Sequence, residues 1–353
     1  MKSVNYFLPK KRGFKQIRNN ISGRQWRDWR WQIKNRIADV SQITDLLNLP
    51  PKRQPALESA AKRYPFCVTP YYLSLCNPQD KSDPIMHQFL PDRREITDKN
   101  TPGDPLGEEK YSPVPGLIHR YRNRVVIIVT TECAVRCRHC TRKNTLSSFA
   151  ADSITRRLPA MVKYIRRREK IREVLVSGGD PLLLETFILD RILGELHSIK
   201  HIEVLRIGTR VPVVLPMRID AELCACLAKH RPLWINTQFN HPREITPEAE
   251  NACRLLQEAG VPVSNQAVLL QGVNDSFTVL TELLNGLQRI MVRPYYVFQC
   301  DGVRGTKHFS VPSSKAAHLA KRLRASLGGL SMPLFVADVP GRKNKVPIET
   351  AAF

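Results

Sequence analysis

Three cysteines, Cys133, Cys137 and Cys140, lie within eight residues of the chain. Their C-x3-C-x2-C spacing follows an apolar run, so the three thiolates can converge on one metal site from a single loop. A four-iron cluster takes one protein ligand per iron, and three cysteines therefore leave one iron open. The spacing favours a [4Fe-4S] cluster with one iron free to bind another molecule.

An open iron of this kind is typical of reducing clusters that bind S-adenosylmethionine and cleave it homolytically. The alternative is a zinc site made by the three cysteines with His139 or another histidine. Zinc ribbons and fingers usually have a second, distant Cys/His pair, and the sequence has none at matching spacing. The radical interpretation is favoured, and the zinc site remains its alternative.

Length and composition indicate a folded protein that does not span a membrane. A chain of 353 residues can bury a full core, and no apolar stretch approaches the ~20 residues that span a bilayer. The N-terminus lacks a continuous apolar region, so we expect neither a signal peptide nor a membrane partner. The other six cysteines are scattered among apolar residues, which suits core packing in a reducing cytoplasm.

The formal net charge is +23, and the first 36 residues hold eleven Lys/Arg against one acidic residue. Such a basic arm could contact nucleic acid or an acidic protein. The segment carries no recognised nucleic-acid motif, however, and charge runs are usually solvated faces. We therefore do not expect a nucleic-acid partner.

The chain divides into two parts by pattern. From about 22 to 65 the apolar residues recur at helical spacing, with Trp26, Trp29, Ile33 and Ile37 on one stripe. Residues 78–116, rich in Pro, Asp and Lys, indicate loop and connector. We expect a helical N-terminal extension with connector over 1–110 and an α/β domain over 111–353.

Short β-rich runs alternate with amphipathic helices in the second part. The expected strands are 125–130, 173–177, 203–207, 233–239, 261–269, 293–299 and 334–337, and the helices include 156–169, 186–197, 220–230 and 247–259. Gly194 and Gly260 fall where helix C-caps are expected. Regular alternation implies right-handed crossovers and a parallel sheet, and six or seven strands suit a partial (β/α)6 barrel. In such barrels chemistry gathers at the C-terminal ends of the strands.

Several polar groups follow the expected strands. Ser177, Gly178, Gly179 and Asp180 come directly after the second strand, where two glycines allow close backbone approach and Asp180 can accept from an ammonium group. By itself this is an ordinary βα turn. One strand after the cysteine loop, it is positioned to hold the amino group of S-adenosylmethionine.

The last strands offer a second set of groups. Asp301 and Asp338 end neighbouring expected strands, and two anions there need a shared cation, although ordinary pairing with local cations is the alternative. Lys343 and Lys345 lie on the loop that follows, where a lysine can bind pyridoxal phosphate covalently. Arginines before the first strand, Arg120 and Arg124 among them, could bind a phosphate through their guanidinium groups.

With these residues in place, the sequence resembles the lysine 2,3-aminomutase family of radical S-adenosylmethionine enzymes. The resemblance runs from Asp28-Trp29-Arg30-Trp31-Gln32 through Thr69-Pro70-Tyr71-Tyr72-Leu73-Ser74-Leu75 and Val114-Pro115-Gly116-Leu117 to the final lysine loop. Further matching runs are 206–210, 212–216, 239–242 and 272–275. Such long ordered similarity is more specific than a cysteine triplet.

The resemblance implies a role for each position. Cys133, Cys137 and Cys140 would hold the cluster, and Ser177 to Asp180, with His139 and Gln266, would surround S-adenosylmethionine. Lys345 would carry pyridoxal 5′-phosphate, with Arg120 and Arg124 near it. Arg142 would pair with the substrate carboxylate, while Asp301 and Asp338 would hold the substrate's distal cation.

The activity so implied is an isomerisation, the radical interconversion of L-lysine and β-lysine by 1,2-amino migration. Its partners would be an amino acid substrate and a reducing electron donor of the flavodoxin or ferredoxin type, in the cytoplasm, and oligomerisation is left open. Alternatives are an arginine or other 2,3-aminomutase, the branch that makes β-lysine for elongation factor P, and a zinc-containing nucleic-acid-binding protein. The chain departs from the family at Gln238 and Phe298, and by a second lysine, Lys343, two residues before Lys345.

Overall fold

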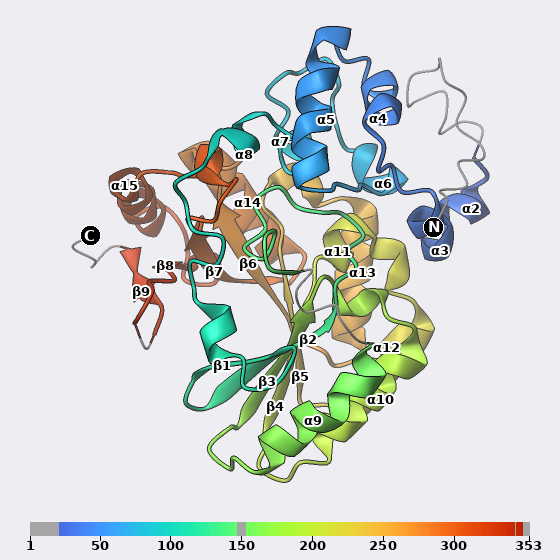
Figure 1. The fold of residues 1–353 in the computed structure, drawn as a ribbon, viewed down its shortest axis with the longest axis vertical. Helices are drawn as coiled ribbons and strands as arrows, with labels where there is room; N and C mark the ends of the chain where they lie inside the picture. Colours follow the sequence, from blue (N-terminus) through green and yellow to red (C-terminus); the bar gives the residue numbers. More distant parts are fainter. Residues whose placement is uncertain (1–20, 147–152, 343, 349–353) are drawn as a thin grey trace.

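The structure, a computed structural model, describes residues 21–146, 153–342 and 344–348. Its centre is a nine-stranded sheet whose strands follow one another in chain order (Figure 1). The strands are β1 (Leu117–Tyr121), β2 (Arg124–Thr130), β3 (Glu173–Gly178), β4 (Val204–Gly208), β5 (Leu233–Thr237), β6 (Val263–Leu269), β7 (Arg293–Gln299), β8 (Leu334–Ala337) and β9 (Val346–Pro347). Strands β2 to β8 are parallel, and the edge strands β1 and β9 are antiparallel to their neighbours.

A helix connects each parallel strand to the next and lies on the outside of the sheet (Figure 1). These helices are α9 (Ile154–Arg166), α10 (Thr186–His197), α11 (Val211–Val214), α12 (Ala221–Lys229), α13 (Pro247–Glu258), α14 (Phe277–Arg289) and α15 (Ser313–Arg324). Fully buried side chains such as Ile127, Met161 and Leu193 join strands and helices in one apolar cluster. Within the described residues the two sheet edges do not pair with each other, so the architecture is the expected open, partial β/α barrel.

The expected parallel strands and helices are all present. The bounds of strands 293–299 and 334–337 and of helix 186–197 are those predicted, and the others differ by one to three residues at an end. Gly260, with φ of +73°, lies just beyond α13 as expected. The prediction for Gly194 is wrong, because this residue lies inside α10, whose C-cap is Ser198.

The sequence prediction missed the first edge strand. Leu117–Tyr121 forms β1 and turns back through residues 122–123 into β2. Arg120 therefore lies on a strand of the sheet, and Arg124 is the first residue of β2, instead of both preceding the sheet. The tight turn places their side chains at the same edge.

The chain before β1 is helical. Its helices are α2 (Gly23–Arg27), α3 (Trp29–Lys34), α4 (Val40–Leu46), α5 (Gln54–Arg63), α6 (Pro70–Leu73), α7 (Pro84–His87) and α8 (Arg94–Thr97), with 3-10 turns η1 (Pro51–Arg53) and η2 (Glu108–Tyr111). Trp26, Trp29 and Ile37 are buried as the helical pattern predicts, although Ile37 forms a β-bridge with Val68 and lies outside a helix. The expected connector 78–116 contains α7, α8 and η2, so describing it as loop alone was wrong.

Among the described residues, no helix combines the length and apolar character that crossing a membrane requires. Most of the basic N-terminal arm, residues 1–20, lies outside the described residues.

Candidate active site

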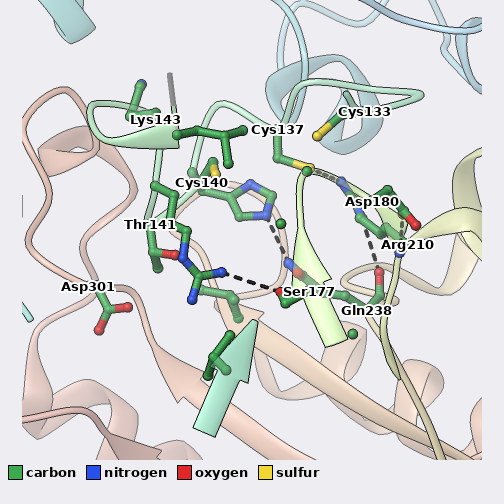
Figure 2. A pocket seen from close by; sticks show the side chains of 18 of the residues that line it. Cys133, Cys137, Cys140, Thr141, Lys143, Ser177, Asp180, Arg210, Gln238 and Asp301 are labelled. Atoms are coloured by element: carbon green, nitrogen blue, oxygen red, sulfur yellow. Dashed lines mark hydrogen bonds between the residues drawn. The ribbon is translucent and has the colours of Figure 1, made fainter. Parts of the chain in front are cut away.

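The cysteine loop leaves the C-terminal end of β2 and lines a cavity of about 770 Å³ at the strand ends. Cys133, Cys137 and Cys140 all lie on the wall of this cavity (Figure 2). Burial raises the pKa of the Cys133 and Cys140 thiols, and neighbouring cysteines raise it further. A bound metal reverses this effect, because a coordinating thiol loses its proton to the metal's charge. Cys133 and Cys140 therefore favour the neutral thiol until a cation binds beside them.

Buried ion pairs attach the cysteine loop to the N-terminal helices. Arg138 Nη2 lies 2.5 Å from Glu95 Oε2, and Lys143 Nζ lies 2.7 Å from the same oxygen. Arg138 also donates from Nη1 and Nη2 to the carbonyl oxygen of Tyr64. Arg36 donates to the carbonyl oxygen of Cys133 at 2.6 Å. Helix α8 and the residues that follow α3 and α5 therefore hold the loop in position.

All the site residues predicted from the sequence line this one cavity. They come from β1, β2, the cysteine loop, β3, β6 and the ends of β7 to β9: Arg120, Arg124, Cys133, Cys137, His139, Cys140, Arg142, Ser177, Gly178, Gly179, Asp180, Gln266, Asp301, Asp338 and Lys345. Lys343, the other candidate lysine, lies outside the described residues.

The glycine pair after β3 is required by the chain's own backbone. A Cβ on Gly178 would lie 2.2 Å from the carbonyl oxygen of Thr130, and one on Gly179 would lie 2.1 Å from that of Glu132. Gly179 N donates to Thr130 O at 2.6 Å, and Asp180 N donates to Glu132 O at 2.7 Å. The close approach expected of these glycines is thus to the segment that leads into the cysteine loop.

Asp180 is buried and uses its carboxylate within the protein. Thr209 Oγ1 donates to Oδ1 at 2.5 Å, and the backbone N–H of Arg210 donates to Oδ2 at 2.7 Å. Burial raises its pKa to about 6, despite these hydrogen bonds. Asp180 therefore ties the end of β3 to the end of β4, and its carboxylate is less available to an ammonium group than the sequence suggested.

His139, between two of the cysteines, is buried on the cavity wall. Its Nε2 lies 2.9 Å from the side-chain nitrogen of Gln238, one of the positions at which the chain departs from the family pattern. Its Nδ1 has no hydrogen-bond partner among the described residues. Desolvation, followed by the charge of Arg210, holds the pKa of His139 well below its usual value. The neutral ring therefore has one nitrogen left for a bound group.

At the β8 end, Asp338 is surrounded by groups that can neutralise it. Lys345 Nζ lies 2.7 Å from Oδ2, and Tyr121 donates its hydroxyl to Oδ1 at 3.1 Å. Arg120 Nη1 lies 3.6 Å from Oδ1, and its Nη2 donates to Val339 O. The lysine amine also lies 4.5 Å from the ring centroid of Phe298. The predicted cation between strand-end carboxylates is therefore supplied in part by Lys345 itself.

Asp301 follows β7, the strand beside β8. Burial raises its pKa to about 7, and the nearby charge of Asp338 adds to this shift, while Lys345 opposes it. The structure records no salt bridge for Asp301 within 4.0 Å among the described residues. Asp301 is thus a partly buried carboxyl on the cavity wall that an incoming cation would stabilise as the anion.

The cavity wall also carries Arg142. Its Nε and Nη2 donate to the two carboxylate oxygens of Glu108, at 2.8 and 2.7 Å, and Nη1 lies 3.4 Å from Ser177 Oγ (Figure 2 shows the last contact). The sequence did not indicate Glu108 as a partner, because η2 was read as connector. The signal in the sequence that could have indicated this partner was the acidic side chain of Glu108 in a chain with a large excess of basic residues.

Arg210 is a second residue that sequence reasoning missed. It follows β4 and reaches the cysteine loop, with Nη1 2.8 Å from Cys137 Sγ (Figure 2). Its Nη2 lies 2.7 Å from Glu244 Oε1 and 2.6 Å from Gln88 Oε1. A charged residue at the end of a parallel strand is the pattern that could have singled it out.

Comparison with known proteins agrees with this geometry. The Radical SAM superfamily model matches residues 127–284, which run from β2 into α14. The chain is thus a radical S-adenosylmethionine enzyme with an α/β, partial-barrel fold.

Curated relatives narrow the class. L-lysine 2,3-aminomutase of Clostridium subterminale is 43% identical over 94% of this chain and 80% of its own. That of Acetoanaerobium sticklandii is 42% identical over 94% and 80%. Glutamate 2,3-aminomutase of Clostridioides difficile is 39% identical over 93% and 78%. The chain belongs to the lysine 2,3-aminomutase family.

Membership implies three cofactors, a [4Fe-4S] cluster, S-adenosylmethionine and pyridoxal phosphate. The cavity residues fit them. Three thiols from one loop suit a four-iron cluster with an open iron, and the unpaired Nδ1 of buried His139 points to a polar group bound beside it. A lysine amine with Arg120 and Arg124 at the same edge suits a phosphate-bearing aldehyde. The zinc interpretation of the cysteines is not supported.

Proposed function

We propose that the chain interconverts L-lysine and β-lysine, as an L-lysine 2,3-aminomutase. The observation that carries this proposal is the pair of carboxyl groups, Asp301 and Asp338, at one end of the cavity with Arg142 on its wall. A diamino acid has a carboxylate at one end and a cation at the other, and this charge arrangement complements both.

The chain's own residues would first hold the cofactors. Cys133, Cys137 and Cys140 would ligate the cluster, and His139, Gln266 and the 177–180 turn would surround S-adenosylmethionine. When bound, the reduced cluster and S-adenosylmethionine supply a carbon-centred radical, and pyridoxal phosphate supplies a conjugated ring that delocalises an unpaired electron. Asp180 would act by positioning, since its oxygens accept from Thr209 and Arg210.

Lys345 is the proposed attachment point of pyridoxal phosphate, and Arg120 and Arg124 would bind near it. The Lys345 amine lies 2.7 Å from Asp338 Oδ2, and this ion pair holds the amine at the cavity that both residues line. A lysine amine is the nucleophile toward an aldehyde. Asp338 therefore has two proposed roles, positioning the Lys345 amine and facing the substrate's distal ammonium.

The substrate would be oriented by its two ends. Arg142 would hold the carboxylate through the guanidinium edge that Glu108 leaves free. Asp301, which has no salt-bridge partner within 4.0 Å in the described chain, would receive the distal ammonium. Holding both ends fixes the carbon between them relative to the cofactors, which is the main contribution that a protein makes to such a reaction.

Substrate choice follows from the charge at the distal end. Glutamate, the substrate in the name of one relative, would place its distal carboxylate against Asp301, and like charges there repel. Arginine carries a distal guanidinium, which paired carboxylates could also bind, so it is the competing substrate to exclude. The remaining site groups do not separate the two cations.

We propose further that an external one-electron donor of flavodoxin or ferredoxin type reduces the cluster, and that the enzyme works in the cytoplasm, where reduced clusters persist.

The test is a substrate comparison with the anaerobically reconstituted enzyme. Lysine, arginine and glutamate are each supplied with dithionite, S-adenosylmethionine and pyridoxal phosphate, and the β-amino acid products are measured by mass spectrometry. We expect β-lysine to form with kcat/KM at least tenfold above the values for the other two. Faster conversion of arginine or glutamate would refute the proposed substrate, and a colourless, iron-free protein would refute the radical mechanism.

A further inference from the structure

A second set of metal-binding side chains lies in the outer helical layer, away from the cavity. Asp190 on α10, Cys226 on α12 and His230 just after α12 each offer one ligand atom, and these atoms all lie within 4.8 Å of one another. None of the three lines the cavity described above. The cofactor chemistry of the family therefore leaves this cluster unexplained.

The two helices bring these residues together through their periodicity. Cys226 and His230 are four residues apart, so they lie on the same face, one turn above the other. Helices α10 and α12 lie beside each other on the sheet (Figure 1), and α10 turns Asp190 toward that face. His197, two turns after Asp190 on α10, has its ring centroid 6.3 Å from that of His230. The face thus contains a thiol, a carboxylate and two imidazoles.

The ligand atoms converge on one carboxylate oxygen. Cys226 Sγ lies 3.6 Å from Asp190 Oδ1, and His230 Nε2 lies 2.7 Å from the same oxygen. Zinc bonds of about 2.3 Å to sulfur and 2.0–2.2 Å to nitrogen or oxygen place tetrahedral neighbours about 3.3–3.6 Å apart. The Cys226 sulfur is already at that distance from Asp190 Oδ1. The His230 ring would have to move about half an ångström away from Asp190 Oδ1 when a metal replaces the hydrogen bond between them.

Two of the three ligand residues are buried, and the third is partly exposed, so the cluster is open to solvent on one side. Cys226 is 3% and His230 9% exposed, while the Asp190 side chain is 39% exposed. Lys229 pairs with the other oxygen of Asp190, Oδ2, at 3.7 Å, and its side chain is 64% exposed, so it can turn into water. An ion can therefore enter past Asp190 and be enclosed by the two buried ligands.

We propose that Asp190, Cys226 and His230 form a binding site for a zinc-type divalent ion that cross-links α10 and α12. A thiolate, an imidazole and a carboxylate are the donor set that zinc prefers, and His197 is the nearest further donor for a fourth position. Binding releases the proton of the Cys226 thiol to solvent, and no oxidation takes place. The site stabilises the barrel wall and is separate from the cysteine loop.

Metal counting on the full-length enzyme tests this proposal. The protein is reconstituted with iron and sulfide, incubated with one equivalent of zinc sulfate and desalted, and iron and zinc are counted by mass spectrometry. We expect about four irons and one zinc per chain. The variants Cys226→Ser and His230→Gln should keep the iron and lose the zinc. Cys224→Ser, on the same helix but outside the cluster, is the matched control and should keep both.

Two further measurements distinguish zinc bound at the proposed site from zinc bound by the cluster cysteines. In a Cys133→Ser/Cys137→Ser/Cys140→Ser chain the zinc should remain, because the cluster cysteines do not hold it, and its X-ray absorption should show one sulfur at about 2.3 Å. Added zinc should raise the melting temperature of the parent chain but not of Cys226→Ser. Zinc retained equally in Cys226→Ser, or absent from a parent chain with full iron, would overturn the proposal.

Discussion

Arg142 and Glu108 form a two-bond ion pair on the cavity wall, with both side chains less than one-fifth exposed. The pair occupies the Nε–Nη2 edge of the guanidinium and leaves Nη1 facing Ser177. Bidentate pairs of this kind fix the plane of a guanidinium. Glu108 therefore orients the arginine that we propose for the substrate carboxylate.

Arg142→Lys should raise the KM for lysine about 10- to 100-fold, because one charge-assisted hydrogen bond is worth about 1.5–3 kcal/mol. Glu108→Gln should raise it less, about 3- to 10-fold, since the arginine keeps its charge and loses only its fixed orientation. Steady-state kinetics measure both effects. Glu109→Gln, an exposed neighbour, is the control. A fall in KM for Glu108→Gln would instead mean that Glu108 competes with the substrate.

Lys345→Ala should abolish covalent attachment of pyridoxal phosphate, because its amine is the proposed nucleophile beside Asp338. The measurement is borohydride reduction followed by peptide mass spectrometry of the adduct. Lys343→Ala should keep the adduct, and it serves as the control from the same loop. An adduct that survives in Lys345→Ala would assign the attachment to another lysine.

Much of the barrel could be predicted from sequence because its strands are short apolar runs separated by amphipathic helices with clear ends. The strand 293–299 was predicted with its observed bounds. Strand β1 was missed because the arginine-rich residues 119–124 were taken to precede the first strand, whereas residues 117–121 pair with β2 across a tight turn at 122–123. Gly194 was misplaced because glycine is common after helices, whereas α10 continues through it to His197.

The cysteines and the groups that follow β3, β7 and β8 could be predicted together, since strand ends of one parallel sheet share one edge. His139, Gln266 and Arg142 were predicted from the family resemblance, and all of these residues line one cavity. Their partners could not be predicted. Nothing in local sequence pairs Arg142 with Glu108, 34 residues away, or Arg210 with Cys137, 73 residues away. Such contacts depend on how the N-terminal helices and distant strand ends meet in space, which periodicity does not report.

The contribution of Asp301 to the stability of the metal-free chain should fall as pH rises from about 4 to 7. Its pKa is raised from 3.8 to about 7 in the folded chain. In that window the folded chain holds a proton that the unfolded chain has released, so raising the pH favours unfolding. Relative to Asp301→Asn, the free energy of unfolding in urea should fall by up to about 1.4 kcal/mol per pH unit. Asp45→Asn, at an exposed position, should track the parent, and a pH-independent difference between parent and Asp301→Asn would contradict the shift.

Glu95→Gln should destabilise the chain by about 3–5 kcal/mol, because Arg138 and Lys143 would then be buried cations without an anion. Arg138 lies within the cysteine loop and Lys143 follows Cys140 by three residues, so iron retention after desalting should fall as well. Urea unfolding and iron content are the measurements. Glu185→Gln is the matched control, since its partner Arg30 is mostly exposed and the pair should contribute less than about 1 kcal/mol. Equal effects of the two variants would argue against the anchoring role of Glu95.

Gly179→Ala should damage the cluster site through the backbone contact between the end of β3 and the cysteine loop. The added Cβ would lie 2.1 Å from the carbonyl oxygen of Glu132 and 2.7 Å from its carbon, and backbone atoms cannot turn away as a flexible side chain can. Either β3 or the start of the cysteine loop must shift, at a cost of about 1–3 kcal/mol. Iron content after anaerobic reconstitution should therefore fall together with the free energy of unfolding. Gly194→Ala provides the opposite case, because its Cβ would meet no atom closer than 3.7 Å and alanine favours the interior of α10 by about 1 kcal/mol. That variant should be more stable with full iron, and if Gly179→Ala behaved in the same way, the backbone contact between β3 and the cysteine loop would not position the cluster.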